Sequence, residues 1–102
     1  MAELVRICAE SDLPHAGKVK EFEAAGRAVC VANVAGAICV TDAVCPHQGG
    51  PLGEGTIEDG RLVCPWHAFA YDPRSGMTEE DPSLRLTVFE SKLENGELRA
   101  RL

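Results

Sequence analysis

Two cysteine–histidine pairs are the residues of this chain whose types and spacing could do chemistry. The first pair is Cys45-x-His47, and after sixteen intervening residues the second is Cys64-x-x-His67. Thiolate and imidazole are soft or borderline ligands that suit zinc or iron rather than calcium or magnesium. Each pair begins with a Cys-Pro dipeptide and uses one of only three histidines, so a chance placement of thiols and surface histidines explains the pattern poorly.

The spacing of the first pair bears on the choice of metal. Structural zinc sites usually place roughly two to four residues between paired ligands. Cys45 and His47 have one residue between them. This spacing is easier to reconcile with ligands that bind different ions of a two-iron cluster, while a zinc-stabilised binding module stays open as an alternative.

The two loops around these residues resemble a known family. CPHQGGPLGEG at 45–55 and CPWHAFAYDPRSG at 64–76 are similar to the cluster-binding loops of the Rieske [2Fe–2S] domain. The closest resemblance is to small Rieske-type ferredoxins and the related small subunit of bacterial nitrite reductase. It implies one [2Fe–2S] cluster per chain, with Cys45 and Cys64 on one iron and His47 and His67 on the other.

The surroundings of the implied cluster resemble only part of the high-potential form of this family. Tyr71 stands where respiratory Rieske proteins carry a tyrosine that hydrogen-bonds a ligand sulfur. Phe69 replaces their serine, and Gly49 and Trp66 occupy the positions of their inter-loop disulfide. We therefore expect a low to intermediate potential within the family span of roughly −150 to +300 mV. Trp66 either shields the cluster or belongs to the core.

Short alternating runs separated by turn residues predict the elements that must position these loops. They favour seven or eight strands and an all-β fold, a Rieske-type antiparallel β-sandwich with a two-loop cluster-binding subdomain, over one domain of residues 1–102. The pair 27–34 and 37–42 is apolar on both faces and should lie at the centre. The expected strands are 4–8, 18–23, 27–34, 37–42, 56–57, 61–64, 84–90 and 97–102, with turns at 35–36, 58–60 and near 95–96.

The remaining cysteines and the third histidine have plainer interpretations. Cys8, Cys30 and Cys39 lie in expected strands and are interpreted as core thiols, with Cys30 and Cys39 as possible cross-strand neighbours. His15 is expected at the surface. Pro82 is a candidate for a third loop over the cluster, although the family's proline-rich form of that loop is reduced to one proline here.

Charge and composition limit the partners and the compartment. Ten basic against sixteen acidic residues give a net charge of −6, which disfavours nucleic acid and anionic membranes. The longest apolar stretch, 28–40, is too short and too interrupted to span a bilayer. No export signal is visible and the number of cysteines is odd, so we expect a cytoplasmic protein with reduced thiols.

The function that these residues favour is electron transfer without catalysis. Only one histidine remains for a second iron site, and no glycine-rich nucleotide loop or evident small-molecule substrate site exists. We expect a one-electron carrier that passes electrons from a reductase to a terminal oxygenase or similar redox enzyme, docking through basic faces of these partners. The alternative is a tightly bound small subunit of a larger reductase, such as assimilatory nitrite reductase.

Overall fold

The computed structural model describes residues 4–47, 49–66 and 68–102, so the predicted ligand His67 lies outside the described residues. The described part of the chain forms ten short strands and two 3₁₀ turns. The strands are β1 (Leu4–Ala9), β2 (Val19–Ala24), β3 (Arg27–Val34), β4 (Ala37–Asp42), β5 (Thr56–Glu58), β6 (Arg61–Val63), β7 (Ala70–Tyr71), β8 (Val88–Phe89), β9 (Ser91–Glu94) and β10 (Glu97–Arg101), and the turns are η1 (Glu10–Asp12) and η2 (Leu52–Glu54).

The four tight hairpins of the fold share one kind of turn. Each joins its strands through two residues that both have positive φ, and the second is always glycine. This is the pattern of a type I′ turn, whose twist matches that of paired strands. The turns are Ala25-Gly26, Ala35-Gly36, Asp59-Gly60 and Asn95-Gly96. These dipeptides therefore fix the register of β2–β3, β3–β4, β5–β6 and β9–β10.

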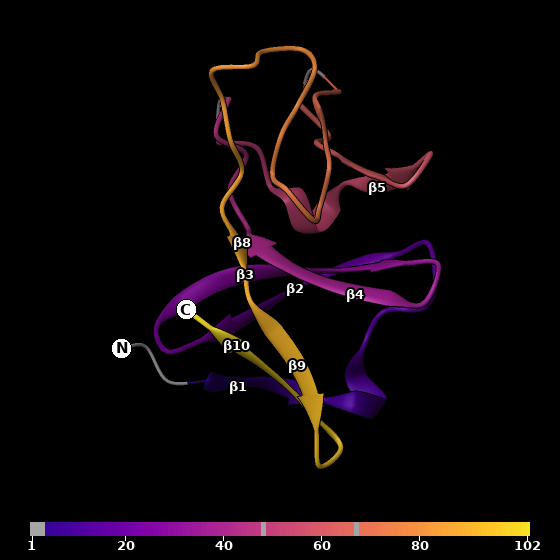
Figure 1. The fold of residues 1–102 in the computed structure, drawn as a ribbon, viewed down its shortest axis with the longest axis vertical. Coiled ribbons are helices and arrows are strands. Elements are labelled where there is room, and N and C mark those ends of the chain that lie inside the picture. The colour runs from indigo at the N-terminus through magenta and orange to yellow at the C-terminus, as the bar shows by residue number, and fades with distance from the viewer. Residues whose placement is uncertain (1–3, 48, 67) are drawn as a thin grey trace.

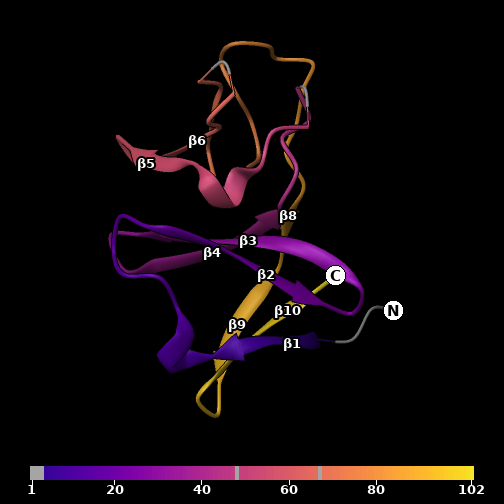
Figure 2. The same cartoon turned by 180° about the vertical axis from the view of Figure 1, so that it is seen from behind.

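The four-stranded sheet β2-β3-β4-β8 lies in the middle of the molecule (Figures 1 and 2). Alternate residues of β3 enter different cores because successive side chains of a strand point to opposite faces. Val29 and Val31 pack with residues of β1 and β10, whereas Cys30 packs with Cys45 and Tyr71 of the cluster-binding part. The prediction that this hairpin is buried on both faces and central is confirmed.

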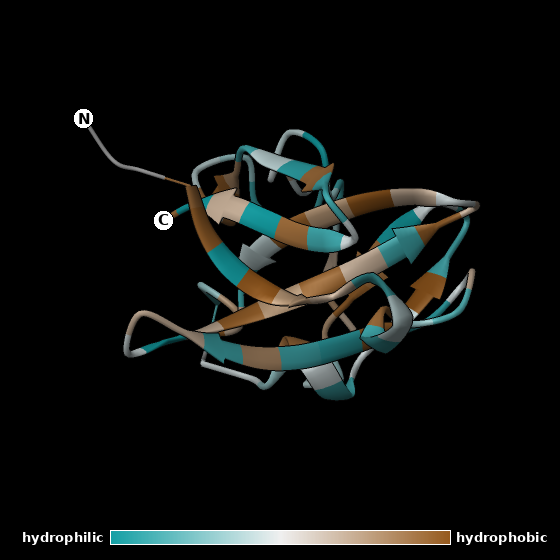
Figure 3. Ribbon diagram, turned by 90° about the horizontal axis from the view of Figure 1, so that it is seen from below, coloured by the Kyte–Doolittle hydropathy of each residue, from teal (hydrophilic) through white to brown (hydrophobic). Residues whose placement is uncertain are grey.

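The three-stranded sheet β1-β10-β9 covers one face of the central sheet. Apolar and polar residues alternate along these strands (Figure 3). Leu98 and Ala100 of β10 are buried, while Leu93 and Lys92 on the edge strand β9 are exposed. Charge on an edge strand limits its pairing with other chains.

The cluster-binding part covers the other face of the central sheet. It consists of the small sheet β5-β6-β7, the turn η2 and the long loops between them, which lie above β3 and β4 in Figure 1. Gly53 of η2 sits directly against β2, since a Cβ atom at this position would lie 2.7 Å from the Cβ of Glu21. Leu52 is fully buried, and its N–H donates to Ala43 O at 2.9 Å. This close packing fixes the base of the first loop.

The antiparallel all-β prediction is confirmed, and the predicted bounds 27–34 and 37–42 are those of β3 and β4. The predicted pairing of 84–90 with 97–102 is wrong, because β9 (Ser91–Glu94) is the hairpin partner of β10. In the stretch 84–90 only Val88–Phe89 forms a strand, and it joins β4 of the central sheet. The described residues include no helix with the length and apolarity needed to cross a membrane.

Candidate metal centre

The two cysteine loops are built in the same way. Cys45 N–H donates to Gly50 O at 2.9 Å, and Cys64 N–H donates to Phe69 O at 2.8 Å. In both loops the cysteine amide therefore bonds the carbonyl five residues later. Ala68 has a positive φ of 57° within the second loop. Each bond closes a compact turn that holds its cysteine against the body of the protein.

The thiols of these loops meet in the buried core. Cys45 and Cys64 are each 1% exposed, and both belong to the same buried cluster of side chains. Burial raises the pKa of the Cys64 thiol, while the Trp66 N–H, 3.4 Å from Cys64 Sγ, acts in the opposite direction. Binding of a metal ion would replace the thiol protons, and the Trp66 N–H would then donate to the Cys64 thiolate.

Gly50 leaves the space that the thiol pair requires. A Cβ atom at this position would lie 2.6 Å from Cys64 Sγ and 3.1 Å from the Cγ of Trp66. A Cβ atom essentially never comes within 3.0 Å of another heavy atom, so any side chain here would displace the sulfur. The φ of Gly50 is not in the left-handed region, so the backbone conformation does not require glycine here. Glycine is needed because the two loops approach each other so closely.

Tyr71 forms a hydrogen bond with Cys45 of this thiol pair. Its hydroxyl oxygen lies 3.1 Å from Cys45 Sγ, and its side chain is fully buried in β7. Burial raises the pKa of the phenol, and the hydrogen bond to Cys45 raises it further. The phenol is therefore protonated at neutral pH, and against a thiolate it acts as the donor. The tyrosine–sulfur hydrogen bond that the resemblance implied is present.

His47 lies at the other side of the loop pair. Its ring stacks on Phe69, with centroids 3.9 Å apart and an angle of 10° between the planes. Asp81 lies near enough to attract a positive charge on His47. The Ser83 hydroxyl and amide bond the Asp81 carboxylate at 2.6 and 3.0 Å, and these bonds chiefly hold the pKa of Asp81 below its usual value. Asp81, next to Pro82, therefore interacts electrostatically with the first loop.

Several sequence-based interpretations can now be decided. Trp66 is 49% exposed, so it is not a core residue. Cys8, Cys30 and Cys39 are buried free thiols, as expected. Cys30 and Cys39 lie on the same face of neighbouring strands but are diagonal, because Cys30 pairs with Thr41 and Cys39 with Ala32.

The donor chemistry of the site fits an iron–sulfur cluster. No group of three His, Cys, Asp or Glu side chains converges within the described residues, a set that lacks His67. A two-iron cluster requires only two side chains on each iron, and the paired thiols of Cys45 and Cys64 provide such a set. His47, held by Phe69 on the adjoining side, is placed to contribute to the second.

The model of the Rieske [2Fe-2S] domain family matches residues 3–90 of the chain. The chain belongs to this family. A Rieske domain carries a [2Fe–2S] cluster, and that cluster is the cofactor of this chain. Its β-sheets and paired loops agree with that assignment.

Relatives of this Rieske domain include short and long proteins. It is 30% identical to ferredoxin CarAc of Metapseudomonas resinovorans over 92% of this chain and 89% of that protein. It is 31% identical to human apoptosis-inducing factor 3, over 93% of this chain but only 16% of the relative, so it spans about a sixth of that protein's length. A ferredoxin–oxygenase complex of carbazole 1,9a-dioxygenase contains a similar chain, with a TM-score of 0.83, 27% identity and coverage of 96% and 92%.

Phe69 is the functional residue that sequence reasoning missed. The sequence comparison marks Phe69 only as a replacement of serine. In the structure its ring stacks on His47, and its carbonyl accepts the Cys64 N–H that closes the second loop. Its position two residues after His67 was a usable signal. An aromatic side chain placed there can reach the other histidine only once both loops have folded together.

Proposed function

We propose that this chain is a one-electron carrier that takes electrons from a reductase and delivers them to a terminal oxygenase or similar redox enzyme. The proposed ligands are Cys45 and Cys64 on one iron and His47 and His67 on the other. The observation that carries the proposal is the buried pair of thiols closed between two matching loops. The cluster supplies a site that gains and loses a single electron.

The chain's own residues prepare the site for that task. Trp66 N–H and the Tyr71 hydroxyl donate to the two sulfurs, so they favour negative charge there. Tyr71 and the surrounding core exclude water from the cysteine side. His47, by contrast, is only partly buried. Electron exchange is therefore proposed to occur at the histidine side.

Exposed apolar residues around the loops support transient docking. Val44 and Trp66 are 50% and 49% exposed. Both flank the glycine turn of the first loop, since Val44 approaches Gly49 and Trp66 approaches Gly50. We propose that a partner covers this small apolar rim while its basic residues face the net charge of −6. The buried free thiols of Cys8, Cys30 and Cys39 support a reducing compartment, and we propose the cytoplasm.

Relatives with related tasks support the same direction of electron flow. CarAc is named a ferredoxin, and the similar chain of the carbazole 1,9a-dioxygenase complex is seen bound to its oxygenase. Nothing in the proposal requires a substrate site in this chain. We therefore propose that it has no catalytic activity of its own and serves as a component of an oxidoreductase system.

Ligand substitutions test this proposal. His67→Cys should retain a cluster and lower its potential sharply, because a thiolate replaces a neutral imidazole. Cys45→Ser should abolish the native cluster, whereas Cys8→Ser, in the core far from the loops, should leave iron content and potential unchanged. An unchanged potential in His67→Cys would refute the ligand assignment.

A second experiment separates a mobile carrier from a fixed subunit. The protein is purified from its native host at low salt and at high salt, and its native mass is measured. A carrier is recovered alone at high salt, because its docking is electrostatic and transient. Recovery in a stable complex at high salt would favour the reductase-subunit alternative. Bound zinc without iron would refute both.

A further inference from the structure

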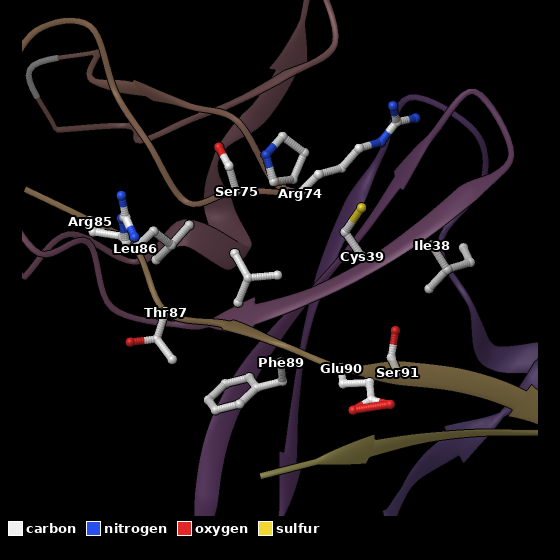
Figure 4. A pocket seen from close by; sticks show the side chains of 12 residues that line it. Ile38, Cys39, Arg74, Ser75, Arg85, Leu86, Thr87, Phe89, Glu90 and Ser91 are labelled. Atoms are coloured by element: carbon white, nitrogen blue, oxygen red, sulfur yellow. The ribbon is translucent and has the colours of Figure 1, made fainter. Parts of the chain in front are cut away.

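A groove of about 780 Å³ runs along the junction between the central sheet and the cluster-binding part. One side is formed by Ile38 and Cys39 of β4, the other by 85–91, and the segment Pro73–Ser75 lies above (Figure 4). Leu86 and Phe89 give it an apolar floor. Of the proposed cluster ligands that the structure describes, Cys45, His47 and Cys64 do not line it, so a molecule in this groove would leave His47 open to a partner.

The groove carries positive charge on a chain that is acidic overall. Arg74 and Arg85 line it and both are exposed. Neither guanidinium forms an ion pair with any residue that the structure describes. Asp72 accepts only the backbone N–H of Arg74, and the Glu90 carboxylate is paired with Arg101 at 3.3 Å. Two cations are thus available to an acidic ligand.

The two guanidinium groups lie at opposite ends of the groove in Figure 4. Arg74 extends over Cys39, whereas Arg85 lies beside Leu86 at the far end. A ligand that contacts both groups at once must therefore be able to reach from one end of the groove to the other. An extended ligand with two separated carboxylates can, since a strand rises about 3.3 Å per residue and so spreads its side chains along the groove.

The backbone on one side of the groove is an unpaired sheet edge. β8 pairs with β4 only at Val40 and Thr41. The chain then turns away, because Glu90 O accepts the Arg101 N–H at 2.8 Å and Ser91 begins β9, which pairs with β10. Among the described residues, no strand is hydrogen-bonded to the first half of β4 on this edge.

The direction of the β4 amides makes this edge usable. Asp42 N–H donates across to Thr87 O at 2.9 Å. Because donors alternate along a strand, the amide of Ile38, four residues earlier, points to the same edge. It faces the groove beyond the last paired residue. An extended peptide could add to the sheet at this place, as edge strands in other proteins bind peptides.

We propose that this groove binds an extended acidic segment of a protein partner. The segment pairs with the edge of β4 at Ile38 and places separate carboxylates on Arg74 and Arg85. Charge complementarity selects an acidic occupant, and the separation of the two arginines selects an extended one. The proposal does not depend on electron transfer, and the occupied groove is a second contact that leaves the cluster loops free.

Binding to the purified, cluster-containing protein tests the proposal. The probe is a capped nine-residue peptide in which glutamate and threonine alternate, compared with an analogue that has lysine for glutamate. Calorimetry should detect binding of the acidic peptide and no binding of the lysine analogue. The double variant Arg74→Gln, Arg85→Gln should weaken binding by roughly tenfold, which is the expected loss for two partly exposed ion pairs. The matched control Lys18→Gln removes an exposed cation outside the groove and should leave the affinity unchanged.

Hydrogen exchange of the Ile38 amide reports backbone pairing at this edge, which electrostatic attraction alone would not produce. The acidic peptide should slow exchange at Ile38, whereas succinate, a compact dianion, should not. No peptide binding, equal binding by the double variant, or equal affinity for succinate without protection of Ile38 would each overturn the proposal. The reduction potential should stay the same in every groove variant, so a failure here is distinct from a failure of the electron-carrier proposal.

Discussion

Replacement of Tyr71 by Phe should lower the reduction potential of the cluster. The hydroxyl lies 3.1 Å from Cys45 Sγ and is fully buried, so the variant removes the hydrogen bond to the sulfur, and the one from the His47 amide, while the ring keeps its packing. Reduction adds negative charge at the cluster, and a donor to sulfur stabilises that charge more in the reduced state than in the oxidised state. Removing the donor therefore favours the oxidised state.

The size of the effect follows from the energy of one hydrogen bond. A buried hydrogen bond contributes about 0.5–1.5 kcal/mol. A one-electron couple shifts by about 59 mV for a tenfold change in equilibrium, or about 1.4 kcal/mol. If most of the bond energy is specific to the reduced state, the potential of Tyr71→Phe should fall by roughly 20–60 mV.

Spectroelectrochemical titration of both proteins measures this shift directly. The control is Thr41→Val, which removes another buried hydroxyl; this one donates to Asp42 O, 3.0 Å away, and contacts the Cys30 thiol, which is not a proposed ligand. Its potential should equal that of the wild-type protein. Equal iron content and urea midpoints establish that Tyr71→Phe is folded and loaded. A folded Tyr71→Phe with an unchanged or raised potential would refute the assignment of Tyr71 as a donor to a ligand sulfur.

Three further predictions concern the loops, the acid stability and the docking of the protein. Gly50→Ala should lose most of its iron, measured by metal analysis, because its Cβ would lie 2.6 Å from Cys64 Sγ; full iron content would contradict the close approach. The pKa of Glu97 lies below the usual value of 4.5, and the hydrogen bond from Arg6 is the main cause. The ionised carboxylate therefore stabilises the fold fully above pH 4.5, and this stabilisation is lost as the pH falls through the lowered pKa. The destabilisation of Glu97→Gln relative to the wild type in urea should therefore be larger at pH 7 than at pH 4, and an equal difference would exclude the ion pair as its cause. Electron delivery to a basic partner should slow as salt rises in stopped-flow experiments, and a rate independent of salt would show that the charge of −6 does not guide docking.

The central part of the fold was predictable because local patterns agree with the final structure. The runs 27–34 and 37–42 are largely apolar segments around Ala35-Gly36, and a type I′ turn there leaves only one register. Burial on both faces follows from the lack of polar alternation. The sequence signal and the tertiary environment therefore favour the same hairpin.

The C-terminal hairpin was misjudged because its most strand-like segment has another partner. Alternating apolar residues at 84–89 indicate a strand, but Leu86 N–H donates to Gly76 O and Arg85 forms a bridge to Met77. The backbone at 85–86 therefore pairs with the end of the second cysteine loop and not with β10. The actual partner of β10 is the polar edge strand Ser91–Glu94, whose weak alternation reflects its exposure.

In the candidate site too, the sequence predicts some contacts and not others. Cys45 and Tyr71 could be related from the sequence because a family pattern encodes their separation. The stacking of Phe69 on His47 and the approach of Asp81 depend on three loops folding together. No local pattern reports such contacts, since each joins residues from different loops.

The most direct test of the central claim is a spectroelectrochemical titration of the purified protein, followed by EPR of the reduced form. We predict a reversible couple that takes up one electron per chain, a low to intermediate potential within the Rieske span, and a Rieske-type EPR signal. A colourless protein with bound zinc and no redox couple would contradict the account.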